Sequence, residues 1–86
     1  MSEFSYTIRD EAGMHARPAG ILVKAMQQFK SDVTLTKGDR SVSLKKLFAL
    51  MGLAVKHGET VLIKAEGEDA EAAVAAAKEV LEREGL

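Results

Sequence analysis

The chain contains no cysteine, a single proline and few aromatic residues. The absence of cysteine excludes disulfides and thiolate chemistry and is typical of proteins in a reducing compartment, so we expect a cytoplasmic protein. No apolar run approaches the roughly 18–20 residues that a membrane span needs. Residues 1–8 are polar and alternating, and they lack the apolar centre of a secretory signal. The sequence therefore predicts neither membrane insertion nor secretion.

An excess of one charge is also lacking. The 12 basic and 13 acidic residues are interleaved and give a net charge of −1, which does not predict a nucleic-acid partner. A length of 86 residues predicts one domain over residues 1–86, with a hydrophobic core of modest size.

Apolar residues alternate with polar ones in four short segments, the pattern of half-buried strands. These segments are Phe4–Ile8, Val33–Thr36, Ser41–Leu44 and Val61–Ala65. The second and third segments flank a glycine-containing turn, so they are expected to form a hairpin.

Three segments instead carry apolar residues at helical spacing. The first helix is expected to begin between Ala16 and Pro18, with Arg17 as a candidate cap residue, and to end at residues 30–32. The second covers Lys45–Val55, and the third follows Asp69, a plausible N-cap. The order β-α-β-β-α-β-α predicts an α+β fold, with helices on one face of a mostly antiparallel sheet.

The segment from Gly13 to Ala19 reads Gly-Met-His-Ala-Arg-Pro-Ala and directly precedes the first helical pattern. His15 would therefore lie at a helix N-terminus, where unpaired N–H groups and the helix dipole favour anions such as phosphate. Imidazole has an ordinary pKa of about 6.5 and is a good nucleophile when neutral. Arg17 can donate two parallel hydrogen bonds to phosphoryl oxygens. The motif thus predicts a phosphoryl acceptor at His15.

Other chemistry has less support. His57 lies in an expected solvent-exposed turn, and a metal site formed with His15 would lack a third ligand, so we predict no metal and no cofactor. The sequence contains no Walker-type glycine loop and no Ser-His-Asp arrangement. Met14 either lines the acceptor loop or anchors it to the core.

The second expected helix has an apolar arc of roughly 220°, far wider than the ~100° that a surface helix buries. Its apolar residues form one cluster of Leu50, Leu53 and Ala54 and an adjoining stripe of Leu47, Phe48 and Met51. Part of this stripe should be exposed and should mark a partner surface. Lys24 is expected on the solvated face of the first helix, where it can steer acidic partners.

The sequence resembles the HPr family, the histidine phosphocarriers of the bacterial phosphoenolpyruvate:sugar phosphotransferase system, over essentially its whole length. Gly13–Ala19 matches the phosphohistidine signature and Leu44–Met51 matches the second family signature. The resemblance implies an open-faced β-sandwich with an antiparallel sheet in the order 1-4-2-3 and three helices on one face.

The resemblance also implies roles for individual residues. His15 would accept the phosphoryl group through Nδ1, within a phosphoryl-binding loop that continues through Ala16, Arg17 and Pro18. Enzyme I and Enzyme IIA would dock on a surface formed by Leu47, Phe48 and Met51 with Lys24 and Lys46.

The sequence departs from the family pattern at a few positions. Lys46 occupies the place of a regulatory serine, and Gln27 and Ala49 stand where some members carry lysine. We expect a monomeric carrier that takes phosphate from phospho-Enzyme I and passes it to Enzyme IIA domains of sugar permeases. A nitrogen-branch phosphocarrier and a regulatory docking module of the same fold are the alternatives. The histidine at position 15 favours a carrier, whereas glutamine there would have favoured the module.

Overall fold

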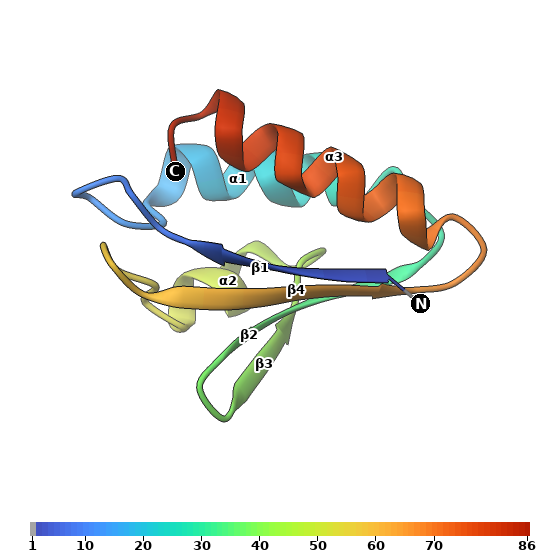
Figure 1. The fold of residues 1–86 in the computed structure, drawn as a ribbon, viewed down its shortest axis with the longest axis horizontal. Helices are drawn as coiled ribbons and strands as arrows, with labels where there is room; N and C mark the ends of the chain where they lie inside the picture. The colour runs from blue at the N-terminus through green and yellow to red at the C-terminus, as the bar shows by residue number, and fades with distance from the viewer. Residues whose placement is uncertain (1) are drawn as a thin grey trace.

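The structure, a computed structural model, describes residues 2–86 (Figure 1). Its elements are β1 (Ser2–Thr7), α1 (Ala16–Met26), β2 (Asp32–Lys37), β3 (Arg40–Ser43), α2 (Leu47–Gly52), β4 (Thr60–Glu66) and α3 (Ala70–Arg83). This order confirms the β-α-β-β-α-β-α prediction. No helix within residues 2–86 is both long and apolar enough to cross a membrane.

The four strands form one antiparallel sheet in the order β1-β4-β2-β3, as the family resemblance implied. Figure 1 shows α1 and α3 lying side by side over one face of the sheet, while α2 packs against α1 and lies close to β3. The first and last strands pair with each other because β4 lies between β1 and β2.

Alternation along the strands decides which residues are buried. The apolar residues of β2 and β4 point toward the helices, and α1 and α3 supply the opposite side of the core. The main contributors are Val33, Leu35, Val61, Ile63, Ala65, Leu22, Met26, Ala73, Ala77 and Leu81. The outer face carries hydroxyl and charged side chains, including a hydrogen-bonded pair, Thr7 and Thr60, whose oxygens are 2.8 Å apart.

Helix α1 ends at Met26, so the predicted end at residues 30–32 is wrong. Two N–H groups after the helix bond three residues back, that of Gln28 to the Ala25 carbonyl and that of Phe29 to the Met26 carbonyl. This tighter turn closes the helix. Phe29 still packs against the core from outside the helix.

Helix α2 is also shorter than predicted, with six residues in place of Lys45–Val55. Leu50 and Leu53 are buried as expected, but Ala54 is exposed and adopts a left-handed conformation with φ of +51°. The chain therefore turns away from the helix axis. The prediction that Ala54 packs beside Leu50 and Leu53 is wrong because of this backbone reversal.

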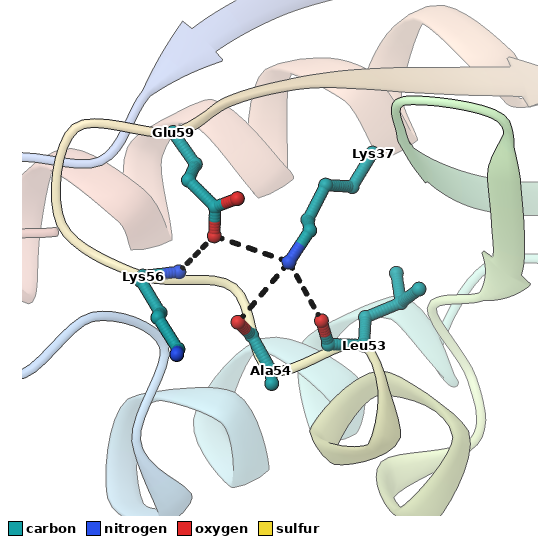
Figure 2. Close-up of polar contacts among 5 residues, drawn as sticks. All are labelled: Lys37, Leu53, Ala54, Lys56 and Glu59. Atoms are coloured by element: carbon teal, nitrogen blue, oxygen red, sulfur yellow. Dashed lines mark hydrogen bonds and ion pairs between the residues drawn. The ribbon is translucent and has the colours of Figure 1, made fainter.

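A lysine from β2 holds the end of α2 (Figure 2). Lys37 Nζ donates hydrogen bonds to the carbonyls of Leu53 at 2.9 Å and Ala54 at 3.2 Å, and it pairs with Glu59 Oε1 at 3.1 Å. The same Glu59 oxygen accepts the Lys56 N–H at 2.7 Å. The Lys56 N–H, and then Lys37, lower the pKa of Glu59. These contacts fix the segment 53–59.

The loop before α1 rests on this segment. Gly13 has φ of +69°, and a Cβ there would lie 2.5 Å from the Val55 carbonyl oxygen. The Met14 N–H donates to that same oxygen at 2.9 Å. Only 5% of Met14 is exposed, so its side chain anchors the loop to the core.

Asp69 occupies the N-cap position of α3, but its side chain does not cap this helix, contrary to the prediction. Its carboxylate instead accepts the N–H groups of Lys30 and Ser31 and the hydroxyl of Ser31. The Ser31 hydroxyl is the main reason that the pKa of Asp69 falls to about 2. Asp69 therefore ties α3 to the chain that follows α1.

Acid should weaken this tie. A carboxylate whose pKa is lowered on folding contributes stability above its unfolded pKa and loses it as the pH falls toward the folded value of about 2. Asp69→Asn cannot titrate, so its stability difference from the wild type should shrink between about pH 5 and about pH 2. Urea unfolding across this range measures the difference. Asp39→Asn, in the exposed β2–β3 turn, is the control. Parallel curves for wild type and Asp69→Asn would contradict the assignment.

The close approach of Gly13 to Val55 gives a second prediction. Gly13→Ala should destabilise the fold by about 2–4 kcal/mol, because it combines a left-handed backbone with a clash against Val55. Gly20→Ala is the matched change within α1, where no atom lies within 4 Å of the added Cβ. It should stabilise by about 0.5–1 kcal/mol. Equal unfolding midpoints for the two variants would show that Gly13 does not need to be glycine.

Candidate functional site

His15 is the N-cap residue of α1 and has an extended backbone, with φ of −82° and ψ of 172°. The first helical hydrogen bond runs from the Ala19 N–H to the His15 carbonyl at 3.1 Å. The helix begins at Ala16, inside the predicted range, but Arg17 is its second residue and not its cap. The anchored Met14 leaves the chain extended at His15, and this sets the cap position.

The first turn of α1 presents unpaired donors. The N–H groups of Ala16 and Arg17 precede the first helical hydrogen bond, and the positive end of the helix dipole lies at the same place. Pro18 has no N–H, but this loss falls among donors that the helix would leave unpaired. The first turn contains no acidic residue, and the His15 side chain does not cap the helix. An anion can therefore approach these donors beside the imidazole.

The His15 imidazole faces a carboxylate that the sequence reasoning missed. His15 Nε2 lies 3.3 Å from Asp10 Oδ2, with 45% of the His15 side chain and 27% of the Asp10 side chain exposed. Asp10 Oδ1 accepts the Ala12 N–H at 2.8 Å. This N–H, and then His15, lower the pKa of Asp10. Since Nε2 faces Asp10, Nδ1 is the ring nitrogen left for other chemistry.

A sequence signal for Asp10 does exist. Asp10 and Gly13 are the first and fourth residues of a tight turn, in which the Gly13 N–H donates to the Asp10 carbonyl at 2.9 Å. Aspartate is favoured at the first position of such turns and glycine at the fourth. The turn brings the Asp10 side chain back toward the residue that follows Met14.

Arg17 is exposed and lies within the same helical turn as the unpaired N–H groups. Among the ion pairs within residues 2–86, none involves Arg17, so no carboxylate there neutralises its charge. Pro18 is buried and secures the turn. His15, Ala16, Arg17 and Pro18 therefore lie on one turn at the start of α1.

The second histidine is engaged elsewhere. His57 lies in the predicted turn and is exposed, and its Nδ1 is 3.1 Å from the Arg9 carbonyl oxygen. Residues 2–86 contain no group of three or more side chains arranged to hold a metal ion. A metal site at His15 and His57 therefore lacks a third ligand within the part of the chain that the structure describes.

The exposed apolar stripe predicted on the second helix is present. Phe48 is 89% exposed, while Leu47 and Met51 are half-buried and contact the core. Lys46 is the exposed N-cap of α2 and makes no side-chain capping bond. We call Leu47, Phe48, Met51 and Lys46 the α2 patch.

The α2 patch lies alongside α1, because both ends of α2 are tied to the neighbourhood of that helix. At its start, Gln27 Nε2 donates to the Lys45 carbonyl at 3.0 Å, and Lys45 Nζ donates to the Phe29 carbonyl at 2.7 Å. Beyond its end, the Val55 carbonyl accepts the Met14 N–H. The two helices therefore run in opposite directions, with the end of α2 closer to the His15 loop.

Lys24 is exposed in the last turn of α1. It is nine residues from His15 and therefore about 14 Å farther along the helix axis. Lys24 therefore does not belong to the helical turn that follows His15. It lies at the end of α1 where α2 begins, on the side of Lys46.

Comparison with known proteins identifies the family of this chain. Residues 2–83 match the family model for the PTS HPr component phosphorylation site. The phosphocarrier protein HPr of Mycoplasma capricolum is 37% identical over 81 residues, which make up 94% of this chain and 91% of that protein.

Solved structures agree with the sequence relatives. A Mycoplasma histidine-containing phosphocarrier protein has a TM-score of 0.97 and 35% identity, covering 99% of this chain and 97% of that one. An HPr dimer from Thermoanaerobacter tengcongensis has a TM-score of 0.79 and 32% identity, covering 100% and 99%. The chain therefore belongs to the HPr family of the phosphotransferase system, and it is a phosphocarrier protein and not an enzyme.

Proposed function

We propose that this chain carries a phosphoryl group on Nδ1 of His15, which it takes from phospho-Enzyme I and passes to Enzyme IIA domains of sugar permeases in the cytoplasm. The observation that carries the proposal is the position of the imidazole. It lies at the open N-terminus of α1, with Nε2 facing Asp10 and Nδ1 left available. The family role, phosphocarrier of the phosphotransferase system, supports this assignment.

The surrounding groups suit a phosphoryl group on Nδ1. Its oxygens can accept hydrogen bonds from the unpaired N–H groups of Ala16 and Arg17, with the helix dipole adding to their effect. The Arg17 guanidinium can donate two further bonds as charge spreads over the phosphoryl oxygens. Phosphoryl transfer depends mainly on positioning and on stabilisation of charge. The first turn of α1 can supply both.

The α2 patch is the proposed docking surface for both partners. An aromatic side chain that is 89% exposed on a small domain contributes little to the core and is well suited to an interface anchor. Lys46 within the patch and Lys24 on the neighbouring end of α1 add positive charge and would favour partners with acidic surfaces. One chain carries both the acceptor and the patch, so a monomer suffices.

Labelling tests the acceptor. With phosphoenolpyruvate and Enzyme I, the wild type should take up one phosphoryl group, and the bond should be labile in acid and stable in base, as expected for an N–P bond. His15→Ala should take up none. Arg17→Ala should slow labelling by about a hundredfold or more, because a cation at the transferring group is lost. The unfolding free energy of Arg17→Ala should differ from that of the wild type by no more than about 0.5 kcal/mol, since Arg17 is exposed.

Arg40→Ala removes an exposed arginine at the start of β3 and is the control for the change in net charge. Wild-type labelling of His15→Ala would disprove the acceptor assignment. Wild-type rates for Arg17→Ala would show that the guanidinium is not involved. Transfer from the labelled protein to purified Enzyme IIA of the sugar branch, compared with its nitrogen-branch counterpart, decides between the two branches.

Phe48→Asp tests the docking surface. It should raise the dissociation constant for Enzyme I by about tenfold or more, because a charge would replace an apolar anchor. The unfolding free energy should change by no more than about 0.5 kcal/mol, because Phe48 is almost fully exposed. Ala72→Asp places the same charge on an exposed position of α3 and should bind normally. If Phe48→Asp unfolds, Phe48 belongs to the core and the patch is wrongly assigned.

A further inference from the structure

We infer that Asp10 is a positioning residue for this transfer: its carboxylate keeps the His15 proton on Nε2, so that Nδ1 presents an unprotonated lone pair to the incoming phosphorus. The inference rests on the proposed role of His15. It adds a residue to the site that the acceptor motif from Gly13 to Ala19 does not contain.

The geometry assigns the proton. An ionised carboxylate only accepts hydrogen bonds, so the imidazole nitrogen that faces Asp10 Oδ2 at 3.3 Å must be the one that carries hydrogen. A neutral imidazole has one N–H, and the other nitrogen is then an acceptor and a nucleophile. With hydrogen on Nε2, that other nitrogen is Nδ1.

Asp10 is held in place without help from His15. Its Oδ1 accepts the Ala12 N–H at 2.8 Å, its carbonyl accepts the Gly13 N–H at 2.9 Å, and its own N–H donates to the Leu86 carbonyl at 3.3 Å. Leu86 is fully buried, so this last bond ties the turn to the core. The carboxylate is therefore in place before the imidazole is modified.

The same contact is favourable throughout the transfer. The Nδ1 lone pair forms a bond to phosphorus as the bond between phosphorus and the donor atom breaks, and the electron pair of that bond stays on the donor. Nε2 keeps its proton, so the ring becomes a cation, which a neighbouring carboxylate stabilises. When the group is passed on, the N–P electron pair returns to Nδ1. The ring then leaves as neutral imidazole and no proton has to move.

His57 offers an internal comparison. Its Nδ1 faces the Arg9 carbonyl at 3.1 Å, and a carbonyl only accepts, so His57 should carry its proton on Nδ1. The two histidines should therefore show opposite tautomers. The charges of His15 and His57 both lower the pKa of Asp10. Both imidazoles should therefore be followed in the same spectrum.

The first measurement is the ¹⁵N chemical shifts of both imidazoles at about pH 8, above the ordinary histidine pKa of about 6.5. In the wild type, His15 should be in the Nε2–H form. Asp10→Asn retains an oxygen for the Ala12 N–H but places an NH₂ group toward the ring. That group donates to Nε2, so His15 should shift toward the Nδ1–H form while His57 stays unchanged.

The matched control is Glu11→Gln, which removes one negative charge from the adjacent exposed residue and should leave both rings as in the wild type. Asp10→Glu, which keeps the carboxylate, should partly restore the Nε2–H form. Because free imidazole side chains already favour hydrogen on Nε2, the shift caused by Asp10→Asn is the decisive result.

The second measurement is the rate of labelling by Enzyme I. Asp10→Asn should slow it by roughly three- to tenfold, the range expected for one partly exposed, charge-assisted hydrogen bond. Glu11→Gln should retain the wild-type rate and Asp10→Glu should recover part of it. Unchanged His15 tautomers in Asp10→Asn, or changed tautomers with an unchanged rate, would overturn the positioning role. The tautomer measurement needs no phosphoryl donor, so a failure of the wild type to accept phosphate would count against the proposed function and not against the Asp10 contact.

Discussion

The hydrogen bond from the Met14 N–H to the Val55 carbonyl is the contact on which the proposed acceptor site depends. It forms because Gly13 has no side chain, which lets the backbone approach the segment 53–59 and turn left-handed at the same residue. The next residue, His15, is then left extended at the start of α1. Lys37 and Glu59 hold the segment on which this loop rests. The position of the imidazole is thus set by the end of β2, which lies more than twenty residues farther along the chain.

The N-terminal end of α1, with the proposed acceptor His15, combines groups of opposite charge around one imidazole ring. Arg17, the unpaired N–H groups and the helix dipole favour an anion, while Asp10 lies at Nε2, the ring nitrogen that a phosphoryl group on Nδ1 would not use. Because the imidazole separates Asp10 from Arg17 and the N–H groups, the carboxylate can bind Nε2 while the donors remain free to bind an anion near Nδ1. A carboxylate in the first helical turn would compete with phosphate for the same donors, and the first turn of α1 contains none.

Helix α2 separates stability from recognition within six residues. Leu50 faces the core and is fully buried, whereas Phe48, two positions earlier on the opposite side, is almost fully exposed. The helix stays short because the chain reverses at Ala54, and Lys37 satisfies the carbonyls of Leu53 and Ala54. A surface that an isolated helix could not maintain is therefore held by contacts made outside it.

The sequence by itself determined the element order, the hairpin, the place of His15 at the start of a helix and the excess of apolar surface around Phe48, because alternation, helical spacing and turn residues are local signals. Tertiary contacts decided the rest. Arg17 was a reasonable cap by local rules, but the anchor at Met14 placed the cap at His15. The apolar pattern continued to Val55, but α2 ends at Gly52. The chain reverses at Ala54, and Lys37 donates hydrogen bonds to the carbonyls of Leu53 and Ala54. Asp69 was predicted to cap α3. Its carboxylate instead accepts hydrogen bonds from Lys30 and Ser31, which lie nearly forty residues earlier in the chain. The contact of Asp10 with His15 was not predicted, since only the folded turn brings the Asp10 side chain to the imidazole. The first three outcomes depend on hydrogen bonds to partners that are distant in sequence, which no local pattern specifies. The residues around Asp10 do favour the turn, but they do not show that its side chain reaches His15.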